Sequence, residues 1–146
     1  MRGIVLALAA GLGLGVVITP GCKSKAPANT PEAVAQAFAD AMASGNKQAA
    51  AAVWDHVAEA RKGNSDWDEI PSGQRQQIIT KLKSSKADEL ALQASAFASG
   101  MKAGTATTSG DTATVQVSGE SGGGVSISLT QTDGKWGVSG FAPAGG

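Results

Sequence analysis

An abrupt change in composition at Gly100 is the feature that most constrains the fold of this chain. Before it, alanine is abundant and apolar residues recur at intervals of three or four. After it, the chain consists largely of Thr, Ser, Gly and Val, with apolar residues at alternate positions. The first pattern predicts amphipathic helices and the second predicts half-buried strands. Helices followed by a run of strands predict an α+β domain whose helices cover the aliphatic face of the sheet.

A helical hairpin is predicted at the start of the domain. Thr30 to Glu32 combines a capping hydroxyl, a proline at the first helical position and an acidic first turn. Gly45 is expected to end the first helix and Asn46 to cap a second, which should continue to Gly63. The apolar stripe of this second helix consists of Ala49, Ala50, Val53, Trp54, Val57 and Ala58.

A second helical region is expected between Pro71 and Gly100. Pro71 opens a segment with a short apolar face, and Ser84-Ser85 suggests a break in it. Residues 87–98 are rich in alanine and are predicted to be helical, with Leu90 and Phe97 pointing inward.

Three antiparallel strands are predicted after Gly100. Residues 112–118 and 125–130 alternate strictly between apolar and polar side chains, and Asp133-Gly134 is a strong hairpin signal leading into residues 135–138. Residues 103–108 can add a fourth strand. Only 4% of the chain is aromatic, so Trp54 and Trp136 are expected to fill the core.

The N-terminal segment has the form of an export signal. Met1 and Arg2 provide a positive start, and an apolar run of roughly 15 residues follows, which is short for a spanning helix of about 20. The end of this run resembles the lipobox of bacterial lipoproteins, because Gly21 precedes Cys22, the only cysteine. Thr19 and Pro20 depart from the usual Leu-Ala type residues.

This resemblance implies that residues 1–21 are a signal peptide, that cleavage falls between Gly21 and Cys22, and that Cys22 carries a lipid. Two alternatives stay open: an ordinary signal-peptidase site at residues 26–28, and an uncleaved anchor. The segment 22–30 is rich in Lys, Ser, Ala, Pro and Asn, and is expected to form a flexible tether between the lipid and the domain.

Several short segments resemble bacterial lipoprotein domains of the nuclear-transport-factor-two-like superfamily. They are residues 30–34, 45–49, 111–115 and 133–138, within a domain at residues 31–142. The resemblance implies a cone-shaped fold, with helices laid on a curved sheet of three to four strands. Many small lipoproteins of this type have no assigned activity, so the fold transfers little function.

Candidate catalytic groups are few. They are Asp40, Asp55, His56, Asp66 and Asp68. His56, the only histidine, could act as a base, although a partly exposed histidine on a helix is the simpler expectation. The chain has no tyrosine, which excludes a tyrosine oxyanion hole of the kind used by ketosteroid-isomerase-like enzymes of this superfamily.

Binding candidates are equally limited. Residues 66–69 form the only acidic cluster, but they lack the ligand spacing of a calcium loop, so no metal or other cofactor is expected. Trp67 and His56 are candidates for lining a pocket or forming a contact surface, and the alternative for Trp67 is packing under a loop. The chain has 12 basic and 12 acidic residues, which gives no reason to expect nucleic acid as a partner.

The sequence therefore predicts a non-enzymatic lipoprotein of the bacterial cell envelope. It would be lipid-anchored to a membrane through Cys22, facing the periplasm or the exterior, and its domain would bind a small apolar ligand or an envelope protein. An isomerase-like or cyclase-like enzyme and a purely structural envelope protein are the alternatives.

Overall fold

The computed structural model describes residues 28–120 and 122–144. The predicted signal peptide, the cleavage site at Gly21 and Cys22, and most of the predicted tether lie outside these residues. Ala28, Asn29 and Thr30 are described, and Asn29 makes contacts with the sheet.

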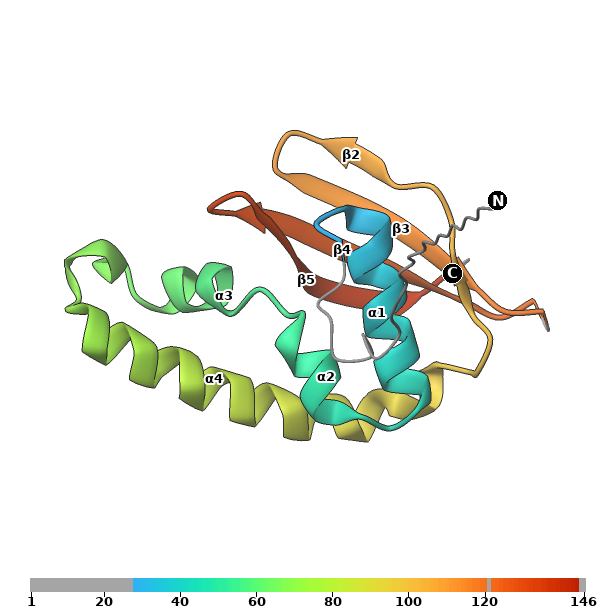
Figure 1. The fold of residues 1–146 in the computed structure, drawn as a ribbon, viewed down its shortest axis with the longest axis horizontal. Helices are drawn as coiled ribbons and strands as arrows, with labels where there is room; N and C mark the ends of the chain where they lie inside the picture. Colours follow the sequence, from blue (N-terminus) through green and yellow to red (C-terminus); the bar gives the residue numbers. More distant parts are fainter. Residues whose placement is uncertain (1–27, 121, 145–146) are drawn as a thin grey trace, which may run out of the picture.

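The α+β class is confirmed: helices precede a five-stranded antiparallel sheet (Figure 1). The helices are α1 (Pro31–Ala43), α2 (Lys47–Ala52), α3 (His56–Gly63) and α4 (Ser72–Gln93), with 3₁₀ turns at Trp67–Glu69 and Ala94–Ala96. The strands are β1 (Lys102–Ala103), β2 (Thr107–Ser109), β3 (Thr112–Ser118), β4 (Gly124–Thr132) and β5 (Lys135–Pro143).

Side-chain caps begin the first two helices at the predicted residues, and a glycine turn separates the two helices. The Thr30 side chain accepts a hydrogen bond from the backbone of Ala33, and the Asn46 side chain accepts one from Ala49. Gly45 lies between them with a φ of 74°, a conformation that residues with a side chain rarely adopt. These caps turn α1 sharply into α2.

The sheet is a meander in the order β1-β3-β4-β5, with β2 also paired to β3. The predicted fourth strand is divided into β1 and β2, which share the same edge of β3. Asp133 and Gly134 both have positive φ, as the predicted tight hairpin between β4 and β5 requires. A bulge between Ser128 and Leu129 shifts the register of β4 with β5.

The core lies between the sheet and the α1 side of the helical layer. In β3, and in β4 as far as Leu129, every second side chain is buried, and Phe38 of α1 is fully buried in the same cluster. Phe38 contacts the rings of Trp54, Phe97 and Phe141, with centroids 5.5–6.0 Å away. Leu90 and Phe97 are buried as predicted, whereas Trp54 and Trp136 are only partly buried against the core.

Two helix boundaries differ from the prediction. The second helix does not continue to Gly63, because the chain leaves the helix at Val53 and re-enters it after Asp55, which caps α3. The expected break at Ser84-Ser85 is wrong, since α4 continues through both exposed serines. Serine disfavours a helix only slightly, and burial of Ala87 and Leu90 holds this part of α4 in place. At its end, the α-helical segment stops at Gln93 and not near Ala98.

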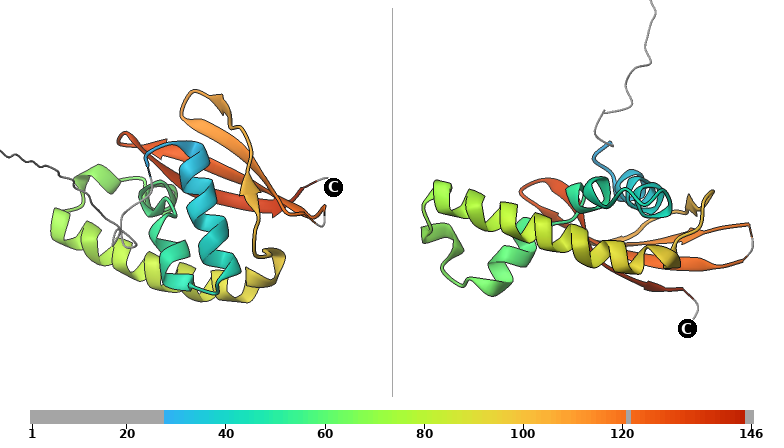
Figure 2. Two further views of the ribbon diagram at one scale, coloured as in Figure 1. Left: turned by 45° about the vertical axis from the view of Figure 1, so that its right-hand side comes forward. Right: turned by 90° about the horizontal axis from the view of Figure 1, so that it is seen from below.

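Figure 2 shows the arrangement of the layers: α1 lies over one face of the sheet, and α4 extends well beyond the sheet with α3 beside it. Within residues 28–120 and 122–144, no helix has the length and apolar character needed to cross a membrane.

Candidate functional site

The chain between α2 and α3, residues 53–55, is hydrogen-bonded to the edge strand β5. We call this segment the joint. Val138 of β5 donates its backbone N–H to the Val53 carbonyl (2.8 Å), and its own carbonyl accepts from the Asp55 N–H (2.9 Å). Gly137 lies so close that a Cβ atom there would be 2.8 Å from the Asp55 Cβ. A side chain at Gly137 would therefore push this joint away from the sheet.

Asp55 is a buried carboxylate that ties α3 to β4. One oxygen accepts from the backbone N–H of Ala58 (2.9 Å), capping the helix. The other accepts from the hydroxyls of Thr130 (2.7 Å) and Thr132 (2.6 Å). Its three hydrogen bonds indicate an anchoring role.

A groove of about 380 Å³ opens beside this joint, between the edge of β5 and helices α3 and α4. We call it the β5 groove. It is lined by Trp54, Asp55, Ala58, Glu59, Lys62, Lys86, Glu89, Gln93, Ser139, Gly140 and Phe141. Two aromatic side chains thus contribute to a site with a strongly charged lining.

Lys86 is the centre of the charged lining. Its Nζ lies 2.8 Å from a Glu89 oxygen, 3.4 Å from a Glu59 oxygen and 4.5 Å from the centroid of the Trp54 ring. The Trp54 indole N–H donates to the second oxygen of Glu59 (3.1 Å), which closes the network. Cation–π and ion-pair contacts of this kind stabilise a half-desolvated lysine.

The Lys86 side chain is only 10% exposed, yet its charge is maintained. Burial lowers the pKa of Lys86, but the hydrogen bond to Glu89 and the charges of Glu59 and Glu89 outweigh this effect. The pKa therefore lies above its ordinary value of 10.5. Lys86 is a fixed positive charge in the groove and not a proton acceptor near neutral pH.

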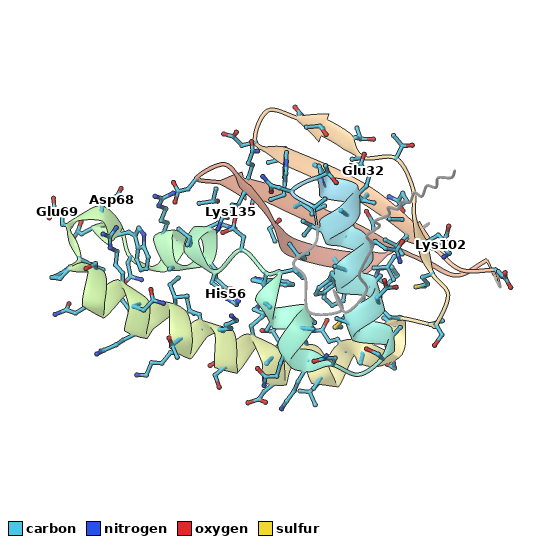
Figure 3. All side chains as sticks on the ribbon, in the orientation of Figure 1. Glu32, His56, Asp68, Glu69, Lys102 and Lys135 are labelled. Atoms are coloured by element: carbon cyan, nitrogen blue, oxygen red, sulfur yellow. The ribbon has the colours of Figure 1, made fainter. Side chains whose placement is uncertain are left out.

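His56 is buried, which corrects the expectation of a partly exposed helical histidine. It lies at the joint between α2 and α3, next to α4 (Figure 3). Its Nε2 is 2.6 Å from the Ala51 carbonyl oxygen and acts as the donor in that bond, while Nδ1 has no partner among the described residues. Burial is the main reason that the pKa of His56 is lowered from its ordinary value of 6.5.

His56 and Asp55 do not form a catalytic pair. The Asp55 oxygens face Ala58 and the threonines of β4, and His56 does not line the β5 groove. Asp40 is exposed on α1, where it accepts from the Gln36 side chain. Asp66 and Asp68 are exposed and follow the end of α3 in the chain. Figure 3 shows Asp68 there.

Trp67 is buried in the 3₁₀ turn before α4 and does not line the β5 groove. The Arg75 guanidinium lies 6.0 Å from its ring centroid, so the side chain packs under the turn and against the start of α4. Within the part of the chain that the structure describes, no three acidic, His or Cys side chains converge in a geometry that could hold a metal ion.

The groove residues Glu59, Lys86, Glu89 and Phe141 were not singled out from the sequence. One signal for Lys86 was present: it precedes Leu90 by four residues and Ala87 by one, so it shares the buried stripe of α4. A lysine on a buried stripe needs an acidic partner, and Glu89 is three residues away. Glu59 comes from another helix and has no comparable signal.

A second pocket lies between the end of α1, the start of α2 and the end of α4. It measures only about 70 Å³ and is lined by Ala41, Met42, Gly45, Lys47, Leu90, Ala91 and Ala94. This volume is far below the roughly 300–1,000 Å³ of typical ligand sites.

Comparisons with models of protein families, with curated proteins and with solved structures found no match to this chain.

Proposed function

We propose that this protein is a lipid-anchored lipoprotein of the bacterial cell envelope whose domain binds a protein partner in the β5 groove. The groove, with Trp54 and Phe141 beside a fixed Lys86, is the observation that carries the binding role. The anchoring role rests on the apolar N-terminal run that ends at Gly21-Cys22. The resemblance to the nuclear-transport-factor-two-like superfamily belongs to the same proposal and rests on the sequence segments that carry it.

A protein partner fits the groove better than a small apolar ligand does. Five of the groove residues are charged: Asp55, Glu59, Lys62, Lys86 and Glu89. An apolar ligand would have to cover these groups without offering them hydrogen bonds, which is unfavourable. The apolar pocket beside α1 is too small for most ligands.

A non-enzymatic role fits the positions of the candidate acids and bases. An isomerase-like or cyclase-like reaction needs a base that faces its substrate. Asp55 reaches the groove but accepts three hydrogen bonds, and His56 is buried outside it. Lys86 is held in its charged form by two glutamates. These observations favour binding over catalysis.

The anchor is tested by metabolic labelling with palmitate. Cells producing the wild type or the Cys22→Ser variant are labelled and then fractionated. The wild type should be labelled and found with the membranes, and the variant should carry no label, because the thioether to the lipid requires a thiol. Equal labelling of the two proteins, or no labelling of the wild type, would contradict the proposal.

A further inference from the structure

The outer edge of β5 is protected along its first half. The Asn29 side chain accepts from the Trp136 N–H (3.0 Å) and donates to the Gly134 carbonyl (2.7 Å). Further along, Val138 exchanges backbone hydrogen bonds with the joint before α3. Such contacts prevent unwanted strand pairing at a sheet edge. The first half of this edge is therefore closed to a partner.

The second half of the same edge is open. Ala144 donates its N–H to Gly124 and so faces β4, and alternation along an antiparallel strand makes Ala142 face β4 as well. Phe141 then directs its N–H and C=O away from the sheet. No described residue bonds to either group, and Pro143 is the next outward-facing position.

The open part of the edge coincides with the β5 groove, because Ser139, Gly140 and Phe141 line it. The outward N–H and C=O of Phe141 are thus directed to the groove side of β5. A groove bounded by a free strand edge and by a helix, with aromatic side chains inside, suits an extended backbone.

We infer that the β5 groove binds an extended segment of a partner protein, which adds to β5 as a further strand by pairing with the backbone of Phe141. This inference rests on the proposed binding function and specifies the conformation of the partner segment that is bound. The main-chain hydrogen bonds are made at Phe141, and the side chains of the segment face Trp54 and helix α4.

The charges of the groove specify the segment further. Glu59 and Glu89 share the single charge of Lys86, and the whole lining, with Asp55 and Lys62, has three acidic and two basic side chains, an excess of one negative charge. Glu89 is 54% exposed and remains accessible to a ligand. A basic side chain on the segment would neutralise this excess, whereas an acidic one would be repelled. The segment therefore carries an arginine or a lysine opposite α4.

The test uses the full chain in detergent micelles, labelled with ¹⁵N for NMR spectroscopy. The probe is the capped pentapeptide Thr-Val-Arg-Val-Thr, which favours an extended conformation. Its addition should shift the Phe141 amide and the Trp54 indole signals together, and exchange of the Phe141 amide with solvent should slow. N-methylation of the peptide backbone should weaken binding about tenfold, through lost hydrogen bonds.

Two variants on α4 distinguish the loss of a charge in the groove from a general effect of substitution in α4 on peptide binding. Glu89→Gln should weaken binding of the arginine peptide by about threefold to tenfold, as for one lost charged contact. Asp88→Asn is the control and should leave binding unchanged. Asp88 adjoins Glu89 in the sequence, but it pairs with Lys47 and does not line the groove. A pentapeptide with glutamate in place of arginine should bind more weakly to the wild type.

The outcomes distinguish the inference from the proposed function. Shifts at Trp54 without slower exchange at Phe141, or equal binding of the N-methylated peptide, would overturn strand addition while leaving a groove that binds peptides. Absence of any shift in the groove would count against both. Concentration-dependent shifts of Phe141 without peptide would identify a second copy of this chain as the occupant and would also overturn the inference.

Discussion

Two parts of this domain are held together by different forces. The body consists of the sheet with α1, α2 and the end of α4, and its core is a continuous cluster of buried apolar side chains. The arm consists of residues 55–86, which include α3 and most of α4. None of these residues belongs to that cluster, and Ile78, Ile79 and Leu82 are only partly buried.

Polar contacts connect the arm to the body and link its helices, although Ala60 and Trp67 are buried within the arm, outside that cluster. Asp55 binds two threonine hydroxyls of β4, Lys86 joins Glu59 to Glu89, and Arg61 lies 3.8 Å from Asp133 at the hairpin. Polar contacts depend on the geometry of the groups and, where the groups are charged, on pH. The stabilisation from burying apolar area depends on neither geometry nor pH. The difference indicates that the body sets the stability of the domain and that the arm sets the shape of the groove beside it.

The largest effect is expected from Phe38→Ala, which removes the central ring of the body. Phe38 is fully buried and contacts three other aromatic rings. The free energy of unfolding should fall by about 3–5 kcal/mol, measured by urea denaturation. Leu92→Ala is the control, because Leu92 is 86% exposed and its truncation should change stability by less than about 0.5 kcal/mol. Similar losses in the two variants would show that the apolar cluster does not dominate stability.

An intermediate effect is expected at the joint between arm and body. In Gly137→Ala the new methyl group would meet Asp55 at 2.8 Å, so the joint must shift from β5. The expected cost is about 1–3 kcal/mol in the free energy of unfolding, measured by urea denaturation.

Gly140→Ala is the matched control for this substitution. Gly140 lies on the same strand, its φ is not positive, and no atom lies within 4 Å of the position of its Cβ. The variant should be neutral, or more stable by about 0.4–1 kcal/mol, because alanine restricts the unfolded chain. If the two variants have equal stability, the close approach at Gly137 does not constrain the joint.

The body was largely predictable from the sequence because its signals are local. Alternation in residues 112–118 defines the buried face of β3, the Asp133-Gly134 pair defines the hairpin, and Thr30 and Asn46 cap the first two helices. Each of these signals depends on residues only a few positions apart.

The arm was predicted less well because its contacts join distant parts of the chain. The stripe through Val53, Trp54 and Val57 fits one helix, yet the pairing of Val138 with Val53 and Asp55 interrupts it. Tertiary contacts of this kind override local helical preference. The groove could not be predicted for the same reason: Glu59, Lys86 and Phe141 meet only after α3 and β5 have been placed.

The smallest effect is expected from His56, through the pH dependence of stability. Burial lowers its pKa in the folded protein below the ordinary value of 6.5. Neighbouring charges act in both directions, because Glu59 raises the pKa while Lys83 and Lys86 lower it. The folded state thus binds this proton less readily than the unfolded state does. The contribution of neutral His56 to stability is complete above pH 6.5 and is lost progressively as the pH falls below it.

His56→Gln should remove this dependence while keeping a side-chain amide that can donate to the Ala51 carbonyl. Urea unfolding measured between pH 8 and pH 5, with intervals of about half a unit, should show a declining free energy for the wild type and a flatter profile for the variant. His56 is the only histidine in the chain, and ordinary carboxylates titrate mainly below this range, at about pH 4. Parallel profiles for the two proteins would contradict the assignment. A flatter profile for the variant would locate the acid sensitivity at the joint between arm and body, where protonation leaves a buried charge whose second N–H has no acceptor among the described residues.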